Sequence, residues 1–76
     1  MKTFIKKIKS ATTKKQLIEI TSDAFKTPAI SGKQYDKLLS YSICREIELG
    51  IWGYLNQYQD KESALQVAQK EFKIKY

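Results

Sequence analysis

The longest helical repeat of the chain, over residues 31–58, places the strongest limit on what the chain can fold into. Apolar residues recur there in steps of three and four, which put them on one side of an α-helix and leave none of the alternation of a strand. Ser31 and Gln34 have the spacing of a capping box, a signal for a helix start. The stretch predicts a central helix over about 32–58, with an inner stripe of Tyr35, Leu38, Leu39, Ile43, Ile47, Ile51, Tyr54, Leu55 and Tyr58.

Two glycines, Gly50 and Gly53, interrupt this repeat. A left-handed Gly50 would end the helix, but Glu46 and Glu48 would then lie in its last turns, where the helix dipole disfavours negative charge. Because the apolar stripe continues beyond Gly50, we expect the helix to continue with a weak point or kink at 50–53. A full break at Gly50 is the alternative.

Shorter helices are expected on both sides of the central one. An amphipathic segment predicts a helix over about 3–9, and Thr13 with Gln16 repeats the capping spacing before a helix over about 14–26. Pro28 ends that helix, and the short turn makes it antiparallel to the central helix. Asp60 is the expected N-cap of a last helix over about 61–73. The predicted inner positions are Phe4, Ile8, Ala11, Leu17, Ile20, Ala24, Ala64, Leu65, Ala68 and Phe72.

These elements predict an all-α fold, a small three- to four-helix bundle that forms one domain over residues 1–76. A chain of this size buries only about 60% of the surface that its unfolded form exposes, which leaves little room for a deep catalytic cleft. We expect residues 74–76 to fray.

Positive charge is concentrated at the start of the chain. Its net charge is +6, and six lysines lie in the first fifteen residues with no acid among them. Arg45 is the one arginine among fourteen basic residues, and lysine favours phosphate contact without sequence choice. A nucleic acid is therefore an alternative partner, and a membrane ranks last. The candidate contacts to phosphates or an acidic partner are Lys2, Lys6, Lys7, Lys9, Lys14 and Lys15.

The sequence contains no arrangement of residues that is typical of catalysis or of cofactor binding. There is no histidine, no Gly-rich phosphate loop and no Cys/His metal spacing. Glu19 and Asp23 are four apart on one face of a helix, but Lys15 and Lys26 are close enough to pair with them. We expect no enzyme, no catalytic residue, no metal and no cofactor. The single Cys44 fits a reducing cytosol, which is the expected location.

Trp52 is the remaining candidate for a functional residue, because it lies off the predicted inner stripe and aligns with Arg45 and Leu49. Trp and Arg are enriched among the residues that dominate protein interfaces. The sequence therefore predicts a non-catalytic protein that binds another protein, as a regulator, adaptor or inhibitor, or that associates with itself. Arg45, Leu49 and Trp52 are the candidate interface.

Overall fold

A computed structural model describes residues 2–51 and 60–76. It contains four helices and no strand in these ranges: α1 (Lys2–Ser10), α2 (Lys14–Phe25), α3 (Gly32–Leu49) and α4 (Lys61–Phe72). The all-α fold class is confirmed. The first residues of α2, α3 and α4 agree with the predicted starts, because each start depends on a capping residue that the sequence displays.

Side-chain caps fix these three starts. The Ser31 hydroxyl accepts the backbone N–H of Gln34 at 3.2 Å, and the side-chain carbonyl of Gln34 accepts the backbone N–H of Ser31 at 2.9 Å. The predicted capping box is therefore complete. The arrangement at α2 differs. The side-chain carbonyl of Gln16 accepts the backbone N–H of Thr12, the residue before the N-cap, at 2.7 Å. At α4 the N–H of Ser63 donates to the Asp60 carboxylate at 2.7 Å and lowers the pKa of that carboxyl.

The predicted continuation of the central helix to residue 58 is wrong at Gly50. α3 ends at Leu49, and Gly50 is left-handed with φ 73°. The Gly50 N–H donates to the Ile47 carbonyl and the Ile51 N–H to the Glu46 carbonyl, both at 3.0 Å, which is the bonding of a Schellman motif. The alternative of a full break is therefore the observed one, and residues 52–59 of the predicted helix lie outside the described residues.

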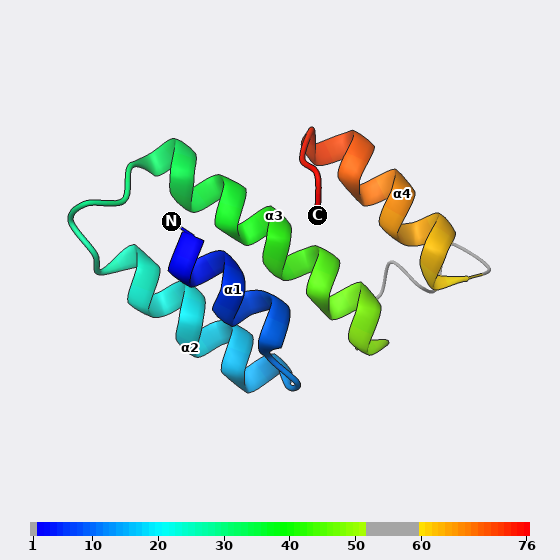
Figure 1. Cartoon of the computed structure of the whole chain (residues 1–76), viewed down its shortest axis with the longest axis horizontal. Helices are drawn as coiled ribbons and strands as arrows, with labels where there is room; N and C mark the ends of the chain where they lie inside the picture. Colours follow the sequence, from blue (N-terminus) through cyan, green and yellow to red (C-terminus); the bar gives the residue numbers. More distant parts are fainter. Residues whose placement is uncertain (1, 52–59) are drawn as a thin grey trace.

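Helix α3 is the centre of the molecule and packs against α1, α2 and α4. Figure 1 shows α1 and α2 along one side of α3 and α4 along the other. It also shows α2 antiparallel to α3, so the predicted hairpin is confirmed. The chain end lies between α3 and α4 (Figure 1), where the Tyr41 hydroxyl donates to the Lys75 carbonyl at 2.9 Å. Tyr76 packs on the core, so the expectation that residues 74–76 fray is wrong.

The buried residues form two clusters joined through α3. The first cluster lies between α1, α2 and α3, and the second lies between α3 and α4. The buried residues of α3 are three positions apart. Three residues turn the helix by about 60° less than a full turn, so the buried side moves around α3 from the first cluster to the second. The first cluster is Ile8, Ala11, Leu17, Ala24, Leu38 and Tyr41; the second is Cys44, Ile47, Ala64 and Ala68.

This geometry corrects the predicted stripe of the central helix. Tyr41 and Cys44 are buried although the stripe omitted them, whereas Tyr35 and Leu39 are only half-buried and Ile51 is 41% exposed. A single straight stripe is expected for a helix that packs on one neighbour. α3 packs on three helices, and its buried side shifts accordingly.

Candidate functional site

All six lysines of the N-terminal segment are exposed, but they do not form one surface. Lys2, Lys6 and Lys9 are separated by four and three residues along α1 and therefore share one side of that helix. Lys7 lies off this side, and its ammonium is 5.7 Å from the centroid of the Phe4 ring. The two remaining candidates, Lys14 and Lys15, begin α2.

Lys9 is in contact with aromatic rings from two other parts of the chain. Its ammonium lies 6.0 Å from the ring centroid of Tyr41, on α3, and 5.2 Å from that of Tyr76, at the chain end. These distances are those of cation–π contacts. Lys9 therefore helps to hold the C-terminal segment beside α1 in addition to contributing positive charge.

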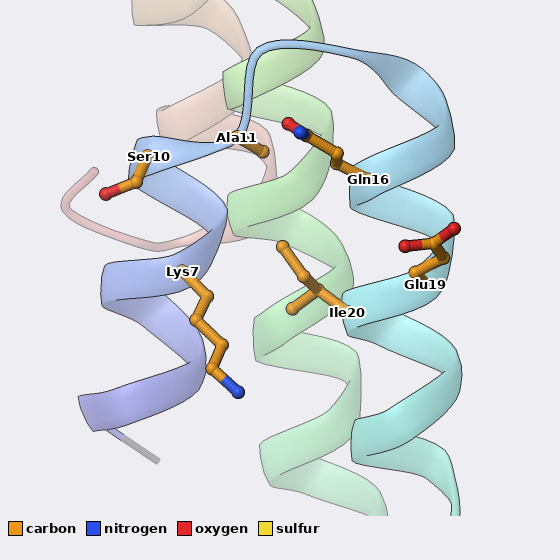
Figure 2. A pocket seen from close by; sticks show the side chains of 6 residues that line it. All are labelled: Lys7, Ser10, Ala11, Gln16, Glu19 and Ile20. Carbon is orange, nitrogen blue, oxygen red and sulfur yellow. The ribbon is translucent and has the colours of Figure 1, made fainter.

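A hollow of about 290 Å³ lies between α1 and α2. Figure 2 shows Lys7 and Glu19 extending from the facing helices, with Ile20 pointing from α2 toward α1. Gln16, also on its lining, accepts hydrogen bonds from the N–H and the hydroxyl of Thr12. We assign this hollow, whose lining also includes Ser10 and Ala11, to the packing of the α1–α2 hairpin.

Arg45, one of the three predicted interface residues, makes contacts within the chain. Its Nε donates to the Ala11 carbonyl at 2.8 Å, and its Nη1 lies 3.2 Å from Oε1 of Glu48. Leu49 packs against the first cluster. Trp52 lies outside the described residues. The guanidinium therefore ties the end of α1 to α3, a role that residue spacing on one helix could not indicate.

Glu48 is the centre of a polar cluster at the end of α3. Its carboxylate accepts the hydroxyl of Tyr76 as well as the Arg45 guanidinium, and its backbone carbonyl accepts the Lys61 ammonium at 3.1 Å. Burial, with the Glu48 carboxylate as a second cause, raises the pKa of the Tyr76 phenol. The cluster joins α3, the start of α4 and the chain end, so its residues stabilise the fold.

Cys44 is fully buried in the second cluster and is a free thiol. Burial, followed by the negative charge of Glu48, raises the pKa of the thiol from 9.0 to about 11. The thiolate is the reactive form of cysteine, so this environment suppresses nucleophilic chemistry.

We expect the Cys44 thiol of the folded protein to react with a disulfide reagent such as DTNB at pH 8 at least about 100-fold more slowly than the unfolded chain, because a pKa higher by about two units lowers the thiolate fraction by that factor. The measurement is the rate of thionitrobenzoate release with and without denaturant. Equal rates at pH 8 would show that the thiol is accessible and unperturbed.

An apolar patch lies on the hairpin of α2 and α3 and consists of the exposed side chains of Ile18 and Phe25 with the half-buried ring of Tyr35. Ile18 and Phe25 are seven residues apart, so they share one face of α2, and their exposed fractions are 55% and 72%. The Phe25 ring meets the Tyr35 ring edge-on, with centroids 5.4 Å apart. A hollow of about 180 Å³ beside these rings is lined by Ala24, Phe25, Ile30, Ser31, Gly32 and Tyr35.

The sequence alone did not indicate this patch. The period of α2 places Ile18 and Phe25 at the flank of its inner face, and a flank position is buried or exposed according to where the neighbouring helices lie. The available signal was the seven-residue spacing of two large apolar side chains off the inner stripe. Large exposed apolar residues grouped together are typical of interaction sites.

Groups that could hold a metal ion are also absent from the described ranges, where no three His, Cys, Asp or Glu side chains come together. Among the same residues, no helix combines the length and the apolar character needed to cross a membrane. Comparisons of the chain with known protein families, with curated proteins and with solved structures find no match. The function proposed below therefore rests on the geometry of the surfaces described above.

Proposed function

We propose that this chain is a small non-catalytic protein that acts in the cytosol by binding another protein, as a regulator, adaptor or inhibitor. The observation that carries this proposal is the apolar patch. Phe25 is 72% exposed although it is a large aromatic residue, and the ring of Tyr35 supports it edge-on. Aromatic side chains held in place by a neighbour are common anchors of protein interfaces. A cytosolic location is supported by the free, buried thiol of Cys44.

The patch has the geometry of a surface that a partner helix or loop can cover. Ile18 and Phe25 stand two turns apart along α2, and the hollow beside Phe25 offers a recess for one apolar side chain. Burial of apolar area provides the driving force for association at such a site. Arg45 and Leu49 serve packing within the chain, so the patch replaces them as the proposed contact, and Trp52 remains a candidate from the sequence alone.

The Ile18→Ser/Phe25→Ser variant should lose the partner while keeping its fold. Both side chains are exposed, so the free energy of unfolding should change by only about 1 kcal/mol or less. Affinity for the partner should fall about tenfold or more, since anchors of this kind dominate interface energies. The measurement is affinity capture from cells that express the chain, followed by titration calorimetry with the purified partner.

The matched control for this test is Gln66→Ser/Lys70→Ser, which changes two exposed residues of α4. It should retain the partner at the wild-type affinity. Equal binding by the wild type and the Ile18→Ser/Phe25→Ser variant would contradict the proposal.

A nucleic acid is the alternative partner, and the placement of Lys2, Lys6 and Lys9 on one exposed side of α1 favours it. Such a row can meet successive phosphates without choosing a sequence. Binding of a thymidine oligonucleotide that weakens steeply with salt and is lost in the Lys2→Ala/Lys6→Ala/Lys9→Ala variant would support this alternative, and unchanged binding in that variant would remove it.

A further inference from the structure

A second surface, distinct from the apolar patch, lies on the other flank of the first turns of α3. It is a groove of about 750 Å³ between α3 and the end of α4. Lys33 and Tyr35 are two residues apart on α3, so they point to nearly opposite sides of the helix and separate the groove from the patch. The residues that line the groove include Lys33, Asp36, Lys37, Phe72, Lys73 and Ile74.

The groove carries a net positive charge, although basic and acidic residues are equal in number after residue 15. Lys33 and Lys37 stand one turn apart on α3, and Lys73 approaches from the end of α4. Asp36 is the acidic residue of the lining. Three ammonium groups from two elements therefore face one carboxylate, an excess that appears only when α4 packs beside α3.

The backbone at Lys73 builds one wall of this groove. Lys73 is left-handed, with φ 55°, a conformation that residues other than glycine adopt rarely. Its N–H donates to the Gln69 carbonyl and closes α4, and the chain then turns so that Ile74 packs against both core clusters. In this turn Lys73 is exposed and Ile74 is half-buried.

The floor of the groove is apolar. Phe72 and Ile74 are half-buried and pack against the second cluster. A ligand that fits this lining needs negative charge to meet the lysines and apolar surface to cover the floor. An acidic peptide that carries an apolar side chain combines the two.

We propose that the groove between α3 and the end of α4 binds a short acidic peptide segment with at least one apolar side chain. Charge complementarity supports this occupant over a nucleic-acid strand for two reasons. Single strands are held by stacking of successive bases on several aromatic rings, and the described lining of this groove contains one aromatic residue, Phe72. A strand also carries a charge at every phosphate, one of which would face Asp36, whereas a peptide can place a neutral or basic residue there.

The inference goes beyond the proposed function, since it names a second site and the chemistry of its ligand. The test is a titration of the full chain with a labelled synthetic peptide of about eight residues that contains aspartate, glutamate and two leucines. It is followed by fluorescence anisotropy at low salt and by backbone amide NMR shifts. The comparison ligands are the same peptide with asparagine and glutamine in place of the acids, and a thymidine oligonucleotide of about equal length.

We expect the acidic peptide to bind and to shift the amides of Lys33, Lys37, Lys73 and Ile74. The Lys33→Ala/Lys37→Ala variant should weaken binding about fivefold or more, because the peptide loses two of the three opposing charges. The matched control Lys26→Ala/Lys70→Ala removes the same charge from residues outside the groove lining and should change affinity less than about twofold.

Three results would overturn the inference: no binding of the acidic peptide at low salt, equal loss of affinity in both double variants, or groove shifts produced by the oligonucleotide and not by the peptide. The Ile18→Ser/Phe25→Ser variant separates this inference from the proposed function. It should bind the peptide like the wild type, since its substitutions lie outside the groove.

Discussion

The Leu38→Ala substitution is expected to destabilise the folded chain by about 2–5 kcal/mol. Leu38 is 1% exposed and lies in the first cluster, where α3 meets α1 and α2. Truncation removes buried apolar surface and leaves a cavity that three helices can fill only partly. The total stability of a 76-residue chain is roughly 5 kcal/mol, so this variant should retain about 3 kcal/mol or less and should unfold at a much lower denaturant concentration than the wild type.

The measurement for Leu38 is chemical denaturation followed by far-ultraviolet circular dichroism. Ile18→Ala is the matched control, since it also truncates a large aliphatic residue but at a site that is 55% exposed. It should cost about 1 kcal/mol or less. Equal losses for the two variants would show that Leu38 is not at the centre of the core.

The Arg45→Ala substitution should have the second largest effect, about 1.5–3 kcal/mol, because a hydrogen bond from a charged donor is lost. The Arg45 Nε donates at 2.8 Å to the carbonyl of Ala11, a buried residue that directly follows α1. The partly exposed pair with Glu48 adds little to this figure. Without the guanidinium, α1 should separate from α3 before the rest of the chain unfolds.

Native-state hydrogen exchange can detect this local opening as faster exchange of the α1 amides. Lys61→Ala is the control, because the Lys61 ammonium also donates to a carbonyl of α3, but in an exposed position. It should change stability by about 0.5 kcal/mol or less. Uniform exchange changes across all four helices in Arg45→Ala would contradict a specific link between α1 and α3.

Helix starts were predictable because the caps are local. Ser31 with Gln34, Thr13 and Asp60 each satisfy backbone N–H groups three residues ahead, and this spacing is visible in the sequence. The antiparallel hairpin followed in the same way from Pro28 and the short turn. These features require no knowledge of which helix packs on which.

The end of α3 could not be predicted, because it depends on distant residues. Glu46 and Glu48 predicted that the helix does not end at Gly50, since acidic residues are unfavourable at the C-terminal end of a helix. In the structure Glu48 is paired with Arg45 of the same helix and accepts the hydroxyl of Tyr76 from the chain end, whereas burial raises the pKa of Glu46 against the opposing effect of Lys14. The contact between Glu48 and the chain end is tertiary, and it accompanies a helix that ends at the left-handed glycine.

The two proposed surfaces also depend on tertiary contacts. Phe25 lies at the flank of α2, where its 72% exposure depends on how the helices pack, and the groove exists because the end of α4 lies beside Lys33 and Lys37. The sequence located an excess of lysine in the first fifteen residues, but it could not show that lysines balanced by acids elsewhere would gather at one groove.

Site-specific photo-crosslinking through position 25 tests the central claim most directly. A benzophenone amino acid replaces Phe25 in cells that express the chain, and a second variant carries it at Lys70, an exposed residue on α4. Binding through the apolar patch predicts a discrete adduct with one protein from position 25 and none from position 70. No adduct from position 25, the same adducts from both positions, or an adduct only with a second copy of the chain would contradict it.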